Sequence, residues 1–271
     1  MMLNEIDKET VGDLVRVAHL LADAARPATL EHFRSAGLTA DNKRPADFDP
    51  VTEGDRAAER AMRDVLAAER PDDAIFGEEY GKSDGTSGFT WVLDPIDGTR
   101  GFLSGTPTWG VLIAVGPAEG PIVGIIDQPY IGERFIGAPG VAETTGPLGT
   151  RPLATRAARP LSEAILFTTF PEVGTDEERL CFEAVRDAAR LVRYGTDCYA
   201  YALLATGQID LVVEAGLQSY DIQGPLAVIQ AAGGIVTDWD GNPCPNGGRV
   251  IAAASKEVHT EALALIQSRL K

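Results

Sequence analysis

The chain places two acidic residues three positions apart where an apolar segment runs into a turn. Residues 91–93 have the composition of a buried strand, and Asp94 and Asp97 follow it, separated by Pro95 and Ile96. We expect Pro95 to end the strand, so that both acids lie where the backbone leaves the sheet. Two carboxylates held this close repel each other, and together with the Ile96 carbonyl they form an oxygen donor set that suits Mg²⁺.

The residues after the two acids have the properties of a ligand-binding turn. Gly98 allows the backbone to approach a ligand closely, and Thr99 would offer its hydroxyl and its amide at the start of a helix. The same composition also occurs in ordinary turns, in which each aspartate hydrogen-bonds its own backbone. These residues alone therefore leave both interpretations open.

Three further acidic turns occur elsewhere in the chain. Glu78 and Glu79 follow the short apolar strand expected at residues 74–76, and an acidic turn at residues 49–55 precedes a helix. Asp221 opens an apolar helix expected at residues 222–232. Each turn alone is compatible with a simple cap, and Asp221 has the character of a plain N-cap. Their joint occurrence is harder to explain by capping.

These segments resemble, in order and approximate spacing, the inositol monophosphatase superfamily. The resemblance extends over residues 43–234, and it rests on Asp49-Pro-Val-Thr52, Gly77-Glu-Glu79, Asp94-Pro-Ile-Asp-Gly-Thr99, and Tyr220-Asp221 followed by Ala231-Ala-Gly-Gly234. It implies an α/β (α+β) fold, the layered αβαβα sandwich of the inositol monophosphatase and fructose-1,6-bisphosphatase type, with the site between the two halves. It also implies a homodimer.

The resemblance implies a metal-dependent phosphate monoesterase with two or three Mg²⁺ ions. By this resemblance Glu78, Asp94 and the Ile96 carbonyl hold one ion, while Asp94, Asp97 and Asp221 hold a second. Such ions lower the pKa of an attacking water and neutralise the leaving oxygen.

The resemblance also assigns catalytic and phosphate-binding roles. Glu78 and Thr99 would orient the water, and Asp49 and Thr52 would support Thr99. The Gly98 and Thr99 amides would bind the phosphate oxygens. Lys43 would act at the entrance, although a solvated lysine fits the sequence equally well.

Substrate choice depends on the segment after Gly195 and Thr196. Many inositol phosphatases have a small residue next, whereas this chain has Asp197, followed by Cys-Tyr as in the histidinol-phosphate phosphatase branch. A carboxylate there favours a cationic leaving group, and Glu214 would share the ammonium or imidazole. The full set of expected substrate-binding residues is Asp97, Gly98, Thr99, Arg100, Gly195, Thr196, Asp197, Glu214 and Asp221.

The favoured substrate is therefore L-histidinol phosphate, an intermediate of histidine synthesis. Alternatives stay open at this point. Asp197 would equally serve as a cap for a helix that begins near Tyr199. The substrate would then be inositol 1-phosphate or a broad range of sugar phosphates, and a catalytically silent regulatory protein of the same fold is a further alternative.

The elements that must position these residues follow from periodicity. We expect helices at residues 5–35, bent near Pro27, and 53–69, then a largely antiparallel run of strands at 90–93, 108–115, 122–127 and 133–137. From residue 159 strands and helices alternate. We place a boundary in the Gly- and Pro-rich segment 144–159. This gives an N-terminal α+β subdomain, 1–148, that carries most metal ligands and a C-terminal α/β subdomain, 149–271, that carries specificity residues.

Composition restricts the partners and the compartment. The net charge of −16 argues against nucleic acid as a partner, but a small phosphate remains possible because a bound cation supplies local positive charge. No secretory signal and no segment of membrane-spanning length is apparent. Three cysteines without metal-binding spacing favour a reducing compartment, and we expect a cytoplasmic enzyme that acts on a small-molecule phosphate monoester.

Overall fold

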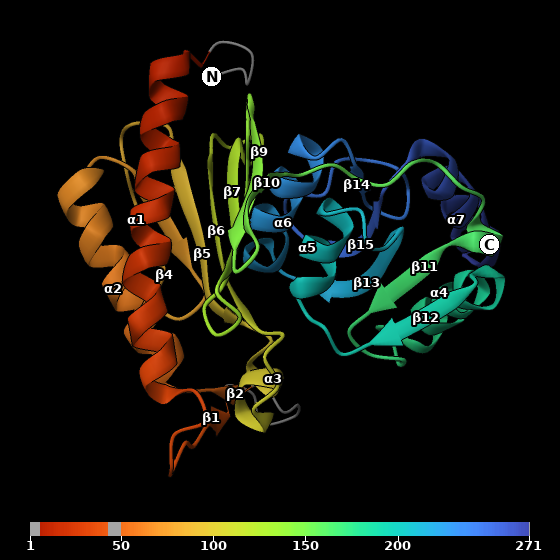
Figure 1. Cartoon of the computed structure of the whole chain (residues 1–271), viewed down its shortest axis with the longest axis horizontal. Helices are drawn as coiled ribbons and strands as arrows, with labels where there is room; N and C mark the ends of the chain where they lie inside the picture. The colour runs from red at the N-terminus through yellow and green to blue at the C-terminus, as the bar shows by residue number, and fades with distance from the viewer. Residues whose placement is uncertain (1–5, 43–49, 271) are drawn as a thin grey trace.

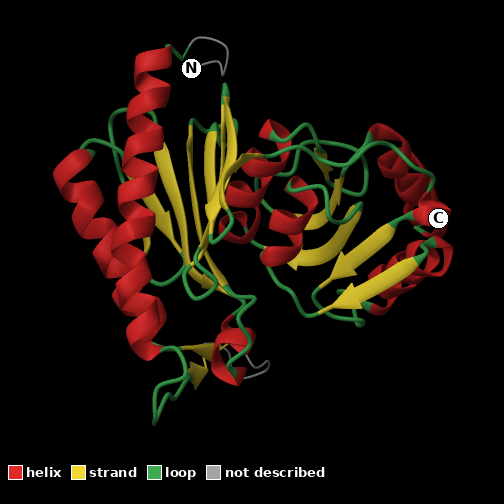
Figure 2. Ribbon diagram, viewed as in Figure 1, coloured by secondary structure: helices red, strands yellow, loops and turns green. Residues whose placement is uncertain are grey.

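The computed structural model describes residues 6–42 and 50–270. Five layers alternate across the molecule: a helix pair, a sheet, a second helix pair, a second sheet and a third helix pair (Figures 1 and 2). Three large apolar clusters lie between successive layers. The αβαβα sandwich predicted from the sequence is confirmed.

The first layer consists of α1 (Lys8–His32) and α2 (Glu53–Glu69). Asp7 caps α1 by accepting a hydrogen bond from the Thr10 amide at 2.8 Å, and α1 continues through Pro27. The helix begins and ends three residues inside the predicted range of 5–35, whereas the predicted bounds of α2 are confirmed. Both helices bury an apolar face against the first sheet.

The first sheet contains eight strands within the described residues, in the order β10-β9-β8-β7-β6-β5-β3-β4. Their bounds are β3 (Ala74–Gly77), β4 (Gly81–Ser83), β5 (Thr90–Asp97), β6 (Gly110–Gly116), β7 (Val123–Gln128), β8 (Glu133–Ala138), β9 (Val141–Gly146) and β10 (Gly149–Pro152). Only β3 and β5 pair in parallel in this part of the chain, so the predicted antiparallel run is confirmed. The short α3 (Thr99–Ser104) follows β5, and β1 (Asp41–Asn42) pairs with β2 (Pro50–Val51).

The structure differs from the sequence prediction at two places in this sheet. Pro95 does not end β5, which continues to Asp97 with a register shift between Asp94 and Asp97. A proline is tolerated in a strand where such an irregularity interrupts the ladder. The strand β10 pairs with β9, so the first sheet extends past the predicted boundary at residue 148. The division into two subdomains stays a prediction.

The central helices α5 (Tyr199–Ala205) and α6 (Ser219–Ala231) lie between the two sheets. The backbone of α6 lies directly on β7 and β8, where glycines face it. A Cβ atom on Gly124 would lie 2.3 Å from the Gly224 carbonyl oxygen, and one on Gly137 would lie 2.4 Å from the Ala227 carbonyl oxygen. These glycines therefore set how closely α6 approaches the sheet, and with it the position of Asp221.

The second sheet has the order β12-β11-β13-β15-β14 within the described residues. Its strands are β11 (Ile165–Thr168), β12 (Leu191–Tyr194), β13 (Leu211–Leu217), β14 (Ile235–Thr237) and β15 (Gly248–Ala253). The outer helices α4 (Asp176–Ala188) and α7 (Lys256–Arg269) cover its far face. Strand β11 pairs in parallel with both β12 and β13, as the alternating pattern of strands and helices indicates.

Two further observations concern the whole chain. None of the helices in the described ranges has the length and apolarity that a membrane span requires. The three cysteines, Cys181, Cys198 and Cys244, are buried and free.

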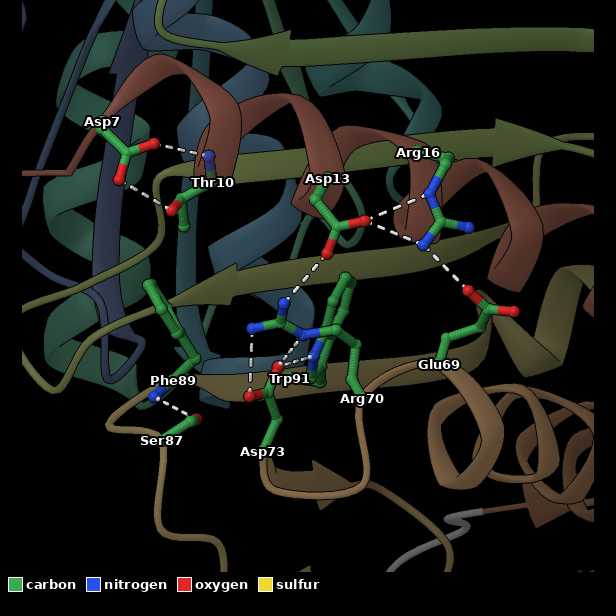
Figure 3. Close-up of polar contacts among 10 residues, drawn as sticks. All are labelled: Asp7, Thr10, Asp13, Arg16, Glu69, Arg70, Asp73, Ser87, Phe89 and Trp91. Carbon is green, nitrogen blue, oxygen red and sulfur yellow. Dashed lines mark hydrogen bonds and ion pairs between the residues drawn. The ribbon is translucent and has the colours of Figure 1, made fainter.

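A buried polar cluster joins the turn after α2 to the centre of the first sheet (Figure 3). The Asp73 carboxylate accepts hydrogen bonds from the Trp91 indole nitrogen at 2.9 Å and from the Arg70 Nε at 2.7 Å. Both Asp73 and Trp91 are buried. Arg70 also reaches Asp13 of α1 at 2.9 Å. Asp73 thereby connects α2, β5 and, through Arg70, α1.

We expect Asp73→Ala to lower the free energy of unfolding by about 2 to 4 kcal/mol, because the buried Trp91 N–H loses its acceptor and Arg70 loses its main partner. Urea denaturation followed by fluorescence measures the loss. Asp13→Ala is the matched control, since Asp13 contacts the same arginine at a more exposed position, where ion pairs contribute little. Equal losses in the two variants would contradict the role assigned to Asp73.

Candidate active site

Three carboxylates from distant parts of the chain meet where β5 ends and α6 begins. Asp94 and Asp97 lie on β5 and Asp221 lies in the first turn of α6. One carboxylate oxygen from each lies within 4.8 Å of the others. The structure thus brings together three of the residues expected to bind metal.

The register of the sheet adds Glu78 to this cluster. Because β3 and β5 are parallel neighbours with Gly77 opposite Leu93, the residues that follow these two lie side by side. The Glu78 amide donates to the Leu93 carbonyl at 3.1 Å, which holds the turn against β5. The carboxylate of Glu78 lies close enough to Asp94 to raise the pKa of that group.

The acids are held in an arrangement that disfavours their negative charge. Burial raises the pKa of Asp94 well above its ordinary value, and the charges of Glu78, Asp97 and Asp221 raise it further. Burial also raises the pKa of Asp97, while the Cys198 amide, which donates to Asp97 Oδ2 at 2.6 Å, opposes this shift. A bound divalent cation would remove the repulsion, and an all-oxygen donor set suits a hard cation.

Asp221 has two functions in the local structure. It occupies the third position of α6 and not the N-cap, which is Gln218, and its Oδ2 accepts a hydrogen bond from the Gln218 amide at 2.6 Å. The same carboxyl group belongs to the acidic cluster. Capping and ligand binding are therefore compatible at this residue.

The turn after Asp97 has the conformation that glycine provides. Gly98 has φ +84°, and α3 begins at the next residue. The Thr99 hydroxyl lies 3.1 Å from the Ile96 carbonyl oxygen and 3.5 Å from Asp55 Oδ1. Thr99 is thus fixed between the turn after β5 and α2.

Asp55 is a residue of this site to which sequence reasoning assigned no role. It is fully buried, and its Oδ2 accepts from the Thr52 amide at 2.8 Å and from the Thr52 hydroxyl at 2.5 Å. Burial raises the pKa of Asp55 to about 6, against the effect of the Thr52 hydrogen bonds. Asp55 thus contacts both Thr52 and Thr99, and the support of Thr99 by Thr52 stays a prediction. In the sequence, the capping-box spacing of Thr52 and Asp55 could have identified Asp55 as a partner of Thr52.

The other expected support of Thr99 lies outside the described residues. Asp49 and Lys43 both fall in the range 43–49, for which the structure describes nothing. The roles expected for these two residues stay predictions.

A turn from the second half of the chain meets Gly98. Asp197 has φ +45°, and a Cβ atom on Gly98 would lie 2.7 Å from the Asp197 Cγ. Burial raises the pKa of Asp197 to about 6, while the nearby Thr108 hydroxyl and the Arg100 guanidinium lower it. The N-cap of α5 is Cys198, and the described residues contribute no side-chain bond to this cap. The alternative interpretation of Asp197 as a helix cap is therefore wrong.

The remaining expected substrate residues surround this turn. The Gly195 amide donates to the Thr168 and Thr169 carbonyls, and the buried Thr196 hydroxyl has no hydrogen-bond partner among the described residues. Glu214 is buried on β13, and its Oε1 accepts from the Thr169 amide at 2.7 Å and from the Thr169 hydroxyl at 2.9 Å. Burial raises the pKa of Glu214 to about 7.

Arg100 connects the two halves of the chain. Its guanidinium carbon lies 5.0 Å from the centre of the Phe170 ring, in the segment between β11 and α4. The residues expected to bind metal are thus neighbours of those expected to bind substrate. They come from both sheets and from α3 and α6.

The sequence is similar to those of known phosphatases. The model of the inositol monophosphatase family matches residues 12–271. The protein named bifunctional phosphatase IMPL2, chloroplastic, from Arabidopsis thaliana is 38% identical over 96% of this chain and 77% of its own length. A histidinol-phosphatase from Streptomyces coelicolor is 35% identical over 95% of this chain and 98% of its own length.

A solved structure gives the same assignment of the fold. An inositol monophosphatase from Zymomonas mobilis superposes with a TM-score of 0.83 at 40% identity, covering 94% of this chain and 98% of that chain. A relative named histidinol-phosphatase and a relative named inositol monophosphatase thus have similar identity to this chain, 35% and 40%.

We expect Gly98→Ala to destabilise the fold more than Gly132→Ala, which serves as the control. Both glycines have nearly the same φ, +84° and +82°, so each alanine costs about 1 to 2 kcal/mol for the left-handed conformation. Only at Gly98 does the new Cβ meet Asp197, since a Cβ on Gly132 has no neighbour within 4 Å. Chemical denaturation gives both losses, and equal losses would contradict the close contact at Gly98.

Proposed function

Since the chain belongs to the inositol monophosphatase family, we propose that it is a Mg²⁺-dependent phosphate monoester hydrolase whose main substrate is L-histidinol phosphate. The observation that carries the substrate proposal is the carboxylate of Asp197 beside the Asp97–Gly98 turn. Membership of the family supports the reaction class, because the two relatives described above are named phosphatases.

The donor atoms fit the metal that the family implies. Glu78, Asp94 and the Ile96 carbonyl would hold one ion, and Asp94, Asp97 and Asp221 a second, with two or three ions in total. The raised pKa values of Asp94 and Asp97 support this set, because buried acids that repel each other need a compensating cation. When bound, Mg²⁺ lowers the pKa of a water and neutralises the leaving oxygen.

The chain's own residues would orient the attacking water. The Thr99 hydroxyl has one proton, and both acceptors within reach, the Ile96 carbonyl and Asp55, belong to the protein. Once that proton is donated, the lone pairs of Thr99 Oγ1 can accept a hydrogen bond from water. Glu78 would accept the second water proton as a hydrogen bond. Asp55 and Thr52 keep Thr99 in place, and Asp49 would assist them.

The phosphate and the leaving group would occupy the space between the two halves of the chain. The Gly98 and Thr99 amides and the Arg100 guanidinium would bind phosphate oxygens. Gly195 and the Thr196 hydroxyl would contact the leaving group, whose ammonium or imidazole would pair with Asp197 and Glu214. The unpartnered hydroxyl of Thr196 supports this assignment, because a buried hydroxyl without a partner is costly.

The second candidate function is hydrolysis of inositol 1-phosphate or of several sugar phosphates. The 40% identity to an inositol monophosphatase favours it. Asp197 argues against it, since a neutral polyol offers no cation for a carboxylate that is already partly desolvated. A silent regulatory protein is disfavoured by the converging acids. We further propose a cytoplasmic homodimer that binds neither nucleic acid nor membrane.

The metal proposal predicts that chelation abolishes phosphate release and that Mg²⁺ restores it. Asp94→Asn keeps the side-chain shape but removes the charge shared between two ions, so kcat/KM should fall at least ~100-fold, on the order of 3 kcal/mol. Steady-state kinetics at saturating Mg²⁺ measures the change. Asp176→Asn, an exposed site on α4, is the control. Near wild-type activity of Asp94→Asn would mean that Asp94 is only a turn residue.

The substrate proposal predicts a selective effect of Asp197→Asn. Loss of the charge should cost roughly 2 to 4 kcal/mol in kcat/KM for histidinol phosphate, because the substrate cation loses its partner. Hydrolysis of inositol 1-phosphate should be unchanged or faster, since it makes no such pair. Parallel assays of phosphate release give the ratio of the two substrates. An equal loss for both would return the inositol or sugar-phosphate function to first place.

A further inference from the structure

Three polar residues four positions apart lie on one face of α2, towards the site. Asp55, Glu59 and Arg63 follow helical spacing, so their side chains project in similar directions from successive turns. Asp55 contacts Thr52 and Thr99, as described above. Glu59 and Arg63 contact the segment that carries Glu78.

The Glu59 carboxylate is fully buried and accepts three hydrogen bonds. Its Oε2 accepts from the Glu79 amide at 2.7 Å. Its Oε1 accepts from the Tyr80 amide at 3.2 Å and from the Arg63 Nε at 2.8 Å. A buried carboxylate is tolerated only with such partners, so these bonds define its position and that of the two amides.

The contact between Glu59 and this turn is very close. A Cβ atom on Gly77 would lie 1.9 Å from Glu59 Oε1 and 2.3 Å from its Cδ. Arg63 extends the contact along the chain, because its Nη2 donates to the Gly81 carbonyl at 2.6 Å and its Nη1 to the Ser83 hydroxyl at 2.9 Å. Glu78 therefore lies between a glycine that touches Glu59 and an amide that Glu59 binds.

We infer that Glu59 is a positioning residue of the metal site, which holds the turn of residues 77–80 so that the Glu78 carboxylate faces Asp94. This inference rests on the proposed function, since it takes Glu78 as a metal ligand. Glu59 acts through backbone amides and does not touch the ion. Residues that orient a metal ligand in this way typically change metal affinity 10- to 100-fold when replaced.

The test is Mg²⁺ affinity, measured by titration calorimetry without substrate. Glu59→Gln preserves shape but turns an amide nitrogen towards one of the three donors, so we expect Mg²⁺ to bind about 10- to 100-fold more weakly. At saturating Mg²⁺ kcat should largely recover, because the ligand itself remains. Glu69→Gln, an exposed change on the same helix, should leave affinity and kcat unchanged.

A double variant tests whether Glu59 acts through Glu78. If it does, Glu59→Gln combined with Glu78→Gln binds Mg²⁺ no more weakly than Glu78→Gln alone. Losses that add up would overturn the inference, since Glu59 would then affect the ions by another route.

A second single variant covers the case in which Glu59→Gln folds poorly. Gly77→Ala leaves every charge in place but pushes the Glu59 carboxylate off the Glu79 and Tyr80 amides. It should weaken Mg²⁺ binding in the same direction. A lower melting temperature with unchanged Mg²⁺ affinity in both variants, beside weakened binding in Glu78→Gln, would overturn the positioning role alone. Unchanged affinity in Glu78→Gln would instead remove Glu78 from the metal set of the proposed function.

Discussion

The repulsion among the carboxylates of Asp94, Asp97 and Asp221 is the constraint on which the rest of the structure depends. One oxygen of each lies within 4.8 Å of the others, although burial disfavours the charge of Asp94 and of Asp97. This arrangement destabilises the folded chain when no cation is bound. A bound cation removes the repulsion and stabilises the fold. The layered architecture supplies the rigidity, because β5 and α6 are both buried between other elements and cannot separate to relieve the repulsion.

The site for metal and the site for specificity share one set of contacts. The amide of Cys198 donates to the Asp97 carboxylate, and the neighbouring Asp197 side chain touches Gly98. Asp197 in turn raises the pKa of Asp97. The side chain that would select a cationic leaving group therefore also packs against the turn that follows a proposed metal ligand. A side chain at position 197 must therefore fit against Gly98, which limits the residues that can replace it.

The sequence was sufficient for the exact bounds of α2, because these follow from local periodicity, and the resemblance to the family supplied the sandwich fold and the grouping of the acids. It was insufficient where the outcome depends on distant partners. Pro95 stays within β5 because β6 tolerates a register shift beside it, and residues 149–152 form a strand because β9 is there to pair with them. Nothing in the local sequence distinguishes Glu59 from an exposed helix glutamate, because its burial depends on the distant turn of residues 77–80.

The face of α2 that carries Asp55, Glu59 and Arg63 limits how the length of the chain can vary. An α-helix turns by about 100° per residue, so one residue inserted between Asp55 and Arg63 would rotate at least one of these side chains out of line with the others. A deletion has the same effect in the opposite sense. Beyond Arg63 a change in length would leave all three contacts intact. A change in length after Arg63 would act instead on the contacts of Arg70 with Asp73 and Asp13, so the whole of this helix should keep its length.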